Sequence, residues 1–216
     1  MFNLPDRCLY NRRISKNKFY EKLKADTRLK DMFVKQVDYI LWKYKLSKET
    51  INLDPTEQVQ EIQVFEIYLK QRELSKEVLE NIDKAIPYPI LHVLIYEGEA
   101  RLAIAYKQRN RNDENRFVIN AYYESNWQPI SDVSINLISG LNLQAVYENI
   151  IRSLMTANAA VEEDLEATVE RQNIIEKLKR ECDKLESRLR SEIQFDRKVE
   201  LNLELQRKKK ELSKFE

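Results

Sequence analysis

The stretch from Val59 to Glu124 decides the fold. It contains four segments, VQEIQVFEIYLKQ (59–71), SKEVLENIDKAIP (75–87), PILHVLIYEGEARLAIAYK (89–107) and RFVINAYYE (116–124). Apolar residues alternate with a period of two in the first segment, which is typical of a strand with side chains packed on both faces. The second segment carries an apolar stripe at helical spacing and ends at two prolines. We therefore expect a strand, a helix and three further strands.

The order of these segments also predicts how the strands pair. The run Ile90–Tyr96 is almost wholly apolar, which favours a strand buried on both faces. A strand, a helix and a buried strand in succession indicate a right-handed parallel crossover. Gly98 and Glu99 suit a two-residue type II′ turn into the third strand. Residues 117–123 supply the fourth strand, after a polar loop at 108–115.

The residues before this block are predicted to be mainly helical. Residues 1–13 read as an extended lead-in, and Ser15 is placed to cap a short helix with the sequence KNKFYEKL. Apolar residues three and four apart then predict a longer helix from about Arg28 to Lys45. That helix would cover one face of the sheet.

The residues after the block are also predicted to be helical. Asn142 is placed to cap an amphipathic helix, with Leu141 and Val146 at the positions of a hydrophobic staple. Aromatic residues become rare after residues 156–160, which indicates a domain boundary there. We expect an αβ domain with N-terminal helices at 1–157 and a helical hairpin or coiled-coil arm at 158–216. The predicted fold class is thus α+β, with a four-stranded mixed sheet, flanking helices and this arm.

The arm follows a heptad pattern from Val161 onward, interrupted at residues 194–200. One interpretation is a helical hairpin with its turn near Phe195 and Asp196, and the other is a straight coiled-coil dimer. Either arrangement leaves apolar surface for a partner. The residues predicted to bind that partner are Leu165, Ile175, Leu178, Leu185 and Leu189.

Charge is spread unevenly along the 216 residues, although the net charge is only +1. Residues 1–50 hold 13 Lys and Arg against 6 Asp and Glu. Aromatic residues are interleaved with this basic stretch, a pattern that suits phosphate contacts and base stacking but that also occurs on a solvated helix face. The residues predicted to contact DNA are Arg12, Arg13, Lys16 and Lys18.

The residue inventory excludes several chemistries. Two distant glycines cannot form a phosphate-binding loop, and one histidine with two distant cysteines cannot form a zinc site. His92 lies within an apolar strand and is interpreted as a core histidine. No apolar run is long enough for a membrane span, and the two cysteines match no disulfide framework. We expect a cytoplasmic protein with reduced thiols and no membrane contact, and we assign it no catalytic residue, metal or cofactor.

Carboxylates are the only plentiful catalytic groups. A helix, three antiparallel strands and a helix approximate a restriction-endonuclease core, which would need acids and a lysine to hold Mg²⁺. Glu97, Glu99 and Lys107 are the available groups, but no strand carries a carboxylate followed two residues later by a lysine. A Mg²⁺-dependent nuclease with a degenerate core of this type is therefore an alternative reading.

Five segments of the chain together resemble a bacterial family, the domain of unknown function 4391. They are FNLP, RISKNKFYEKL, FVKQVDYILWKYKLSKETINL, AIPYPILHVLIY and QFDRKVELNLEL, and they span nearly the whole chain. The resemblance carries over no catalytic residue. It implies a context, since relatives are encoded beside helicases and DNA methyltransferases in restriction-like or phage-defence gene clusters.

These observations lead to one expected function and two alternatives. We expect a non-catalytic adaptor subunit of a restriction-like or phage-defence complex, which docks onto a helicase or DNA methyltransferase through the C-terminal arm and also touches DNA. The first alternative is the Mg²⁺-dependent nuclease. The second is a scaffold that forms homo-oligomers through the coiled coil.

Overall fold

The computed structural model describes residues 2–110, 113–155 and 165–215. The chain divides into two compact units, Met1–Asn158 and Ala159–Glu216. The boundary predicted between residues 157 and 158 falls outside the described residues. Among the described helices, none combines the length and the apolar composition needed to cross a bilayer.

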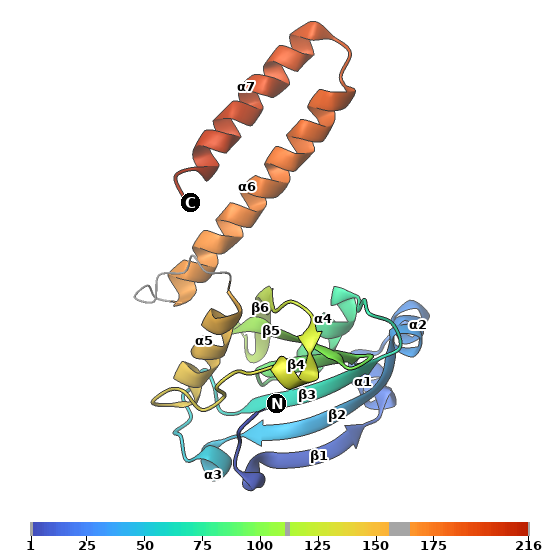
Figure 1. The fold of residues 1–216 in the computed structure, drawn as a ribbon, viewed down its shortest axis with the longest axis vertical. Helices are drawn as coiled ribbons and strands as arrows, with labels where there is room; N and C mark the ends of the chain where they lie inside the picture. Colours follow the sequence, from blue (N-terminus) through green and yellow to red (C-terminus); the bar gives the residue numbers. More distant parts are fainter. Residues whose placement is uncertain (1, 111–112, 156–164, 216) are drawn as a thin grey trace. The chain divides into compact units, whose positions relative to one another are not determined.

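The first unit is built on a mixed sheet (Figure 1). Its strands are β1 (Leu9–Ile14), β2 (Val37–Leu46), β3 (Ile62–Leu69), β4 (Ile90–Tyr96), β5 (Glu99–Asn110), β6 (Asp113–Glu124) and β7 (Gln128–Pro129). They lie in the order β1-β2-β3-β4-β5-β6, and β7 pairs with β5. β3 and β4 are parallel, as the crossover predicted, and the other pairs are antiparallel. The α+β class is confirmed, but the sheet has seven strands instead of four.

The additional strands come mainly from the N-terminal region. The helix predicted for residues 28–45 is wrong in its second half, because α2 (Thr27–Gln36) ends where β2 begins. Residues 37–46 are rich in β-branched and aromatic residues, and they gain a full ladder of pairs with β3. The predicted extended lead-in is also more regular than expected, since it contains a short 3-10 turn, η1 (Asp6–Cys8), and the edge strand β1.

The remaining elements of this unit are helical. They are α1 (Lys16–Leu23), α3 (Lys48–Ile51), α4 (Lys76–Ala85), η2 (Ile130–Asp132) and α5 (Leu143–Leu154). The predicted caps of α1 and α5 are present, since the Ser15 hydroxyl accepts from Asn17 N and Asn142 Oδ1 accepts from Ala145 N at 2.9 Å. The predicted staple of α5 is wrong, because Leu141 is 93% exposed.

The tight turn between β4 and β5 also differs from the prediction. Tyr96 pairs with Glu99, so the two turn residues are Glu97 and Gly98. Their φ angles are 45° and 83°. Positive φ at both positions is the type I′ geometry, so the predicted type II′ turn at Gly98–Glu99 is wrong by one residue. The predicted polar loop at 108–115 is likewise shorter, because β5 continues to Asn110 and β6 begins at Asp113.

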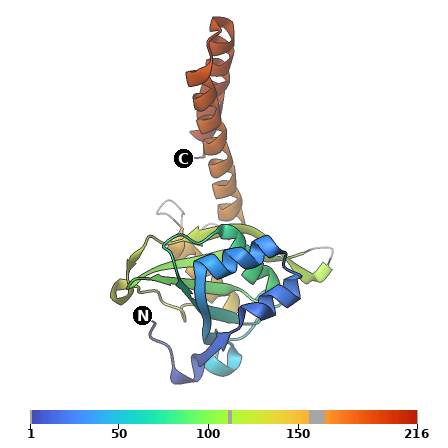
Figure 2. The same cartoon turned by 90° about the vertical axis from the view of Figure 1, so that its right-hand side faces the viewer.

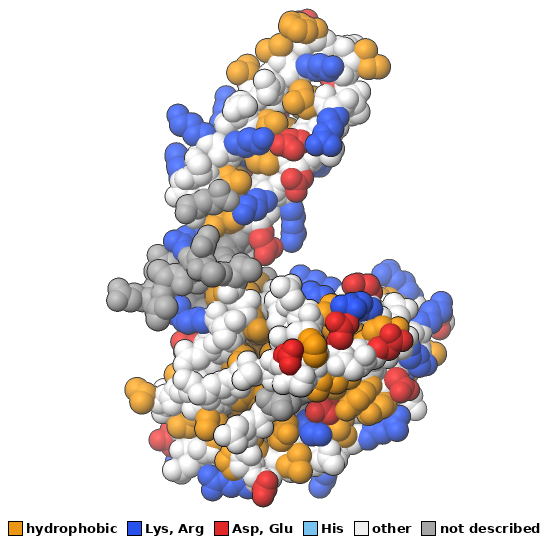
Figure 3. All heavy atoms as spheres, viewed as in Figure 1, with side chains coloured by type: hydrophobic (Ala, Val, Ile, Leu, Met, Phe, Trp, Pro, Cys, Tyr) orange, Lys and Arg blue, Asp and Glu red, His pale blue; other side chains and the backbone are white. Residues whose placement is uncertain are grey.

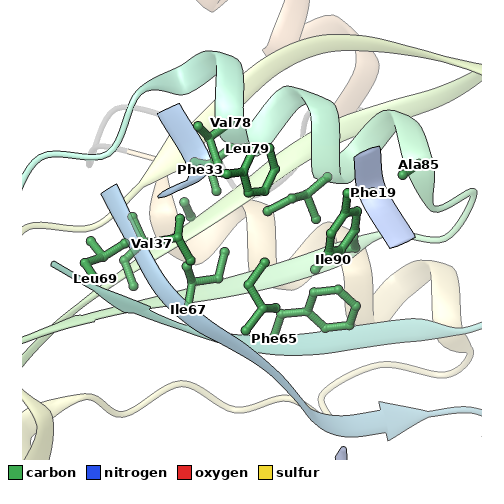
Figure 4. Close-up of a cluster of buried hydrophobic side chains, with 14 of the residues drawn as sticks. Phe19, Phe33, Val37, Phe65, Ile67, Leu69, Val78, Leu79, Ala85 and Ile90 are labelled. Atoms are coloured by element: carbon green, nitrogen blue, oxygen red, sulfur yellow. The ribbon is translucent and has the colours of Figure 1, made fainter. Parts of the chain in front are cut away.

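The main core lies between the sheet and the helices α1, α2 and α4, which cover one face, here called the helical face (Figures 2 and 4). Phe19, Phe33 and Leu79 from the helices pack with Phe65 and Ile67 from β3. Each such side chain contributes about 1.5–3 kcal/mol by leaving water. This burial holds the helices at fixed positions on the sheet.

The opposite face of the sheet is covered by α5 over β5 and β6. The Tyr147 hydroxyl donates to Ala105 O at 2.6 Å and accepts from Lys107 N at 2.7 Å. The β4 ladder with β5 reaches only the Leu91–Ile104 pair, so this hydroxyl satisfies strand groups that β4 does not reach.

The second unit is a helical hairpin formed by α6 (Leu165–Ser191) and α7 (Phe195–Leu212). The seam between the two helices contains Cys182, Leu185, Leu189, Leu201 and Leu205. Two ion pairs, Lys208–Glu181 and Lys209–Glu186, each at 2.8 Å, flank it. The chain therefore folds back on itself, as the hairpin interpretation proposed, with the connection at residues 192–194.

Candidate functional site

A cluster of buried ionisable groups lies under α4. Asp83 points from α4 toward the helical face of the sheet, where His92 (β4), Lys107 (β5) and Tyr122 (β6) meet it. His92 Nε2 lies 3.0 Å from Asp83 Oδ2, Lys107 Nζ lies 2.8 Å from Oδ1, and the Tyr122 hydroxyl donates to Oδ2 at 2.6 Å. One carboxylate thus joins a helix to three strands.

Lys107 also caps the C-terminal end of α4. Its ammonium group donates to the carbonyl oxygens of Asp83 at 3.0 Å, Ile86 at 3.0 Å and Tyr88 at 2.8 Å. The last carbonyls of a helix lack partners within the helix and carry the negative end of its dipole, so a cation is favoured there. Burial lowers the pKa of the Lys107 ammonium, and the adjacent Asp83 opposes that shift.

The charges within this network are balanced. Burial alone would raise the pKa of Asp83, but His92 and Lys107 together lower it to about 2, so the carboxylate is ionised at neutral pH. Burial and the Asp83 charge raise the pKa of Tyr122, which keeps that phenol protonated as a donor. His92 Nε2 faces Asp83 Oδ2, which is an acceptor, so this nitrogen donates the hydrogen bond. His92 Nδ1 has no hydrogen-bond partner among the described residues.

Three side chains of the network are shielded from solvent. The side chains of Asp83 and His92 are fully buried and that of Lys107 is 1% exposed. A carboxylate that is bound to side chains from three strands in this way fixes α4 on the sheet. His92 is a core histidine, in agreement with the sequence interpretation, and its partner is Asp83.

The groups considered for a nuclease are not brought together. Glu97 lies on the β4–β5 turn, and Glu99 pairs with Arg72 at 2.6 Å. Lys107 is eight residues further along β5, which corresponds to about 26 Å of strand, and it is committed to Asp83. In residues 2–110, 113–155 and 165–215, no three His, Cys, Asp or Glu side chains are grouped so as to hold a metal ion.

The four cations predicted to contact DNA have different environments. Arg12 and Arg13 are exposed on the edge strand β1, and Lys18 is exposed on α1. Lys16 is half-buried, and its ammonium group donates to the carbonyl oxygens of Phe33 and Val37 at the end of α2. Burial lowers the pKa of Lys16. Lys16 is therefore occupied by a structural contact, whereas the two arginines and Lys18 are open to solvent.

The predicted partner-binding residues of the arm lie mostly inside it. Leu185 is buried in the seam and Leu189 lines it, while Leu178 is buried and Ile175 is half-buried. The side chain of Leu165 lies outside those described. Among the described residues of the arm, the exposed large apolar side chains are instead Ile193, Phe195, Val199 and Leu203, at 91%, 77%, 44% and 63%. Apolar residues at the tip appear in orange at the top of Figure 3.

The sequence does contain a signal for the missed role of Asp83. It follows Leu79 by four residues and Ile82 by one, so it falls on the inward side of the apolar stripe of α4. A carboxylate at such a position needs a buried cation or donor. The partners themselves are 9, 24 and 39 residues away, and no local pattern connects them.

Comparison with known proteins identifies the family. The family model described as Domain of unknown function (DUF4391) matches residues 2–212, which is nearly the whole chain. No curated protein and no solved structure matches the chain. The resemblance noted in the five sequence segments is thus confirmed, and the chain belongs to the family of the domain of unknown function DUF4391.

Proposed function

We propose that this protein is a non-catalytic adaptor that docks onto a partner through its C-terminal hairpin. The observation that carries the proposal is an apolar stripe on the outer side of α7, formed by Phe195, Val199 and Leu203 and here called the outer stripe. Residues at i, i+4 and i+8 lie on one side of a helix. The seam residues Leu201 and Leu205 point into the hairpin, so the outer stripe is not used by the fold of the arm.

The hairpin makes this stripe suitable for binding. Its two helices are held together by the seam and by the Lys208–Glu181 and Lys209–Glu186 pairs, so the arm needs little ordering when a partner arrives. An amphipathic helix that presents anchors at this spacing fits an apolar groove on another protein. We therefore keep the docking role predicted for the arm. The residues that we assign to partner binding are those of the outer stripe, in place of the seam residues.

The proposed partner is a helicase or a DNA methyltransferase of a restriction-like or phage-defence assembly. This choice follows from the context that the family resemblance implies. The network around Asp83 supports a non-catalytic role, because the side chains of Asp83, His92 and Lys107 are buried and held by one another. The protein would then hold its partner in position, and the partner would perform the chemistry.

The test is co-purification of the full chain with the products of the neighbouring genes. The variant Phe195→Gln/Val199→Gln/Leu203→Gln removes the stripe from an exposed helix face, so the arm keeps its seam and its helicity. The matched control, Lys198→Ala/Asn202→Ala/Gln206→Ala, changes three exposed positions at the same spacing on the same helix. We expect the first variant to lose at least tenfold in affinity and the control to bind like the wild type.

Two results would contradict the docking proposal. One is unchanged binding by the stripe variant. The other is a dimer of the full chain, measured by light scattering, that the stripe variant converts to a monomer while partner binding is unaffected. That second result would assign the outer stripe to self-assembly, as in the scaffold alternative.

A further inference from the structure

Two arginine-capped aromatic stacks flank the edge strand β1. On the helical face, the Arg12 guanidinium lies 4.5 Å from the centre of the Tyr10 ring, and the centre of the Tyr10 ring lies 4.0 Å from that of Trp42, with the two rings tilted by 36°. On the opposite face, the Arg13 guanidinium lies 4.5 Å from the centre of the Tyr39 ring, and Tyr39 stacks on Tyr68 at 4.2 Å and 15°. These six residues are here called the β1 edge patch.

Strand alternation places the two stacks on different faces. Arg12 pairs with Trp42, and Arg13 pairs with Leu41, so the neighbouring arginines point to opposite sides of β1. Each guanidinium lies over its ring in a cation–π contact. Both arginine side chains are exposed, whereas the four rings beneath them are half-buried. Each stack therefore ends in an exposed guanidinium that rests on half-buried rings.

The two arginines are not engaged by acids or carbonyl groups among the described residues. Neither guanidinium forms an ion pair or hydrogen bond with another described residue. Each keeps five N–H donors, which can bind a phosphate with two parallel hydrogen bonds. The carboxylate of Glu66, on the second strand from β1, is buried and lies 3.5 Å from Lys43 Nζ. The patch is thus positively charged, in a segment with 13 cations against 6 acids.

We infer that the β1 edge patch binds a single-stranded nucleic acid. The phosphate backbone runs along β1 between the two guanidinium groups, and unpaired bases stack on their outer planes, extending each aromatic stack by one layer. Aromatic rings and arginine planes hold bases of any sequence in this way, and each stacked base adds substantially to affinity. A duplex keeps its bases inside, so it can use only the phosphate contacts. This inference does not depend on the outer stripe of the arm.

The experiment measures binding of the full chain to a fluorescein-labelled, mixed-sequence 15-nucleotide DNA by anisotropy, with the same sequence as duplex DNA and as single-stranded RNA. Arg12→Lys/Arg13→Lys keeps both charges but removes both planes, and Arg12→Gln/Arg13→Gln removes charge and plane. The matched control is Lys30→Gln/Lys35→Gln, which removes two exposed cations from α2 without touching an aromatic ring. Quenching of Trp42 fluorescence gives a second readout at the patch itself.

We expect the single strand to bind at least fivefold more tightly than the duplex. The Gln variant should lose at least tenfold in affinity, the Lys variant at least threefold, and the α2 control less than twofold. The slope of log K against log salt should fall by about 1.4 in the Gln variant, since each phosphate contact contributes about 0.7 for a single strand. RNA bound as tightly as DNA supports stacking and charge as the basis of recognition.

Several outcomes would overturn the inference. They are absence of binding in 50 mM salt, equal affinity for duplex and single strand, wild-type affinity in the Lys variant, and an equal loss in the α2 control. Loss of partner binding with intact DNA binding in the outer-stripe variant would separate the two proposals. A patch that binds an acidic peptide but no nucleic acid would show that it is a protein-docking site, which also contradicts the inference.

Discussion

Lys107 and Asp83 are 24 residues apart in the sequence, yet Lys107 Nζ lies 2.8 Å from Asp83 Oδ1 in the interior of the first unit. The two charges replace each other's lost hydration, and the ammonium group also satisfies three carbonyls at the end of α4. Neither side chain can be removed without leaving a buried polar group unpaired.

Replacing Lys107 by Met should destabilise the first unit by about 3–5 kcal/mol, because the buried carboxylate then lacks its cation. Urea unfolding at pH 7, followed by Trp fluorescence, measures this, since both tryptophans, Trp42 and Trp127, lie in that unit. Lys84→Met is the control. The Lys84 side chain is 57% exposed on α4, next to Asp83 in the sequence, and its replacement should cost less than about 0.5 kcal/mol. Equal costs for the two variants would contradict the role assigned to Lys107.

Acid should weaken the first unit through Asp83. The pKa of this carboxyl is lowered to about 2 in the folded protein, below the value of about 3.9 in an unfolded chain. A carboxyl whose folded pKa is depressed contributes stability above its unfolded pKa, and the contribution is lost as pH falls through the folded pKa. The window is therefore pH 4 to pH 2, and the loss is about 2–3 kcal/mol.

The measurement compares unfolding free energies of the wild type and Asp83→Asn between pH 5 and pH 2. Other carboxyl groups titrate in both proteins, so only the difference between the proteins reports Asp83. That difference should shrink as the pH falls. A constant difference across this range would show that Asp83 does not titrate in the window.

Cys182 should report opening of the hairpin. It is buried in the seam, and burial raises the pKa of its thiol, so a thiol reagent should modify it slowly in the wild type. Leu201→Ala leaves a cavity in the seam and should speed modification of Cys182 at least tenfold, because about 2–5 kcal/mol of packing is lost. Peptide mass spectrometry measures the rates.

Two controls accompany this experiment. Cys8 lies in the other unit and should react at an unchanged rate. Leu203→Ala removes the same atoms from an exposed position on α7 and should leave Cys182 protected. Equal rates of Cys182 modification in the two leucine variants would contradict the position of Leu201 in the seam.

The two glycines should differ in their tolerance of alanine. At Gly140 the φ angle is 155°, and an added Cβ would lie 2.7 Å from Val146 N, so Gly140→Ala should cost at least about 2 kcal/mol. At Gly98 the φ angle is 83°, but the space around it is open, so Gly98→Ala should cost about 1 kcal/mol. Urea unfolding ranks the two variants, and the reverse order would contradict this prediction.

The central block was predictable because its local signals agree. Ser15, Asn142 and the run Ile90–Tyr96 each identify an element by cap or periodicity, and the structure has all three. The prediction for residues 37–46 failed because the spacing of their apolar residues fits both a helix and a strand. Ile40 and Tyr44 are four apart as in a helix, but Ile40 and Trp42 also alternate with Tyr39 and Leu41 as in a strand. Pairing with β3 decides between them, and pairing partners are not encoded locally.

The candidate sites were predictable only in part, for the same reason. A heptad pattern locates the seam, but it does not say which leucines face a second helix of the same chain. Once α7 packs on α6, Leu185 is buried and Leu203 is exposed. For the cations, the spacing of Arg12 and Arg13 gave no hint that each would lie on a ring from β1 or β2.

The hydroxyl of Tyr147 sets an order of events during synthesis. It completes the hydrogen bonding of β5 at Ala105 and Lys107, and it is made 40 residues after Lys107. At about 5–20 residues per second, a ribosome needs roughly 2–8 s for that length. During this interval the backbone groups of Ala105 and Lys107 lack their Tyr147 partner. Chaperones that bind strands with unpaired backbone groups would therefore act on this protein before α5 is complete.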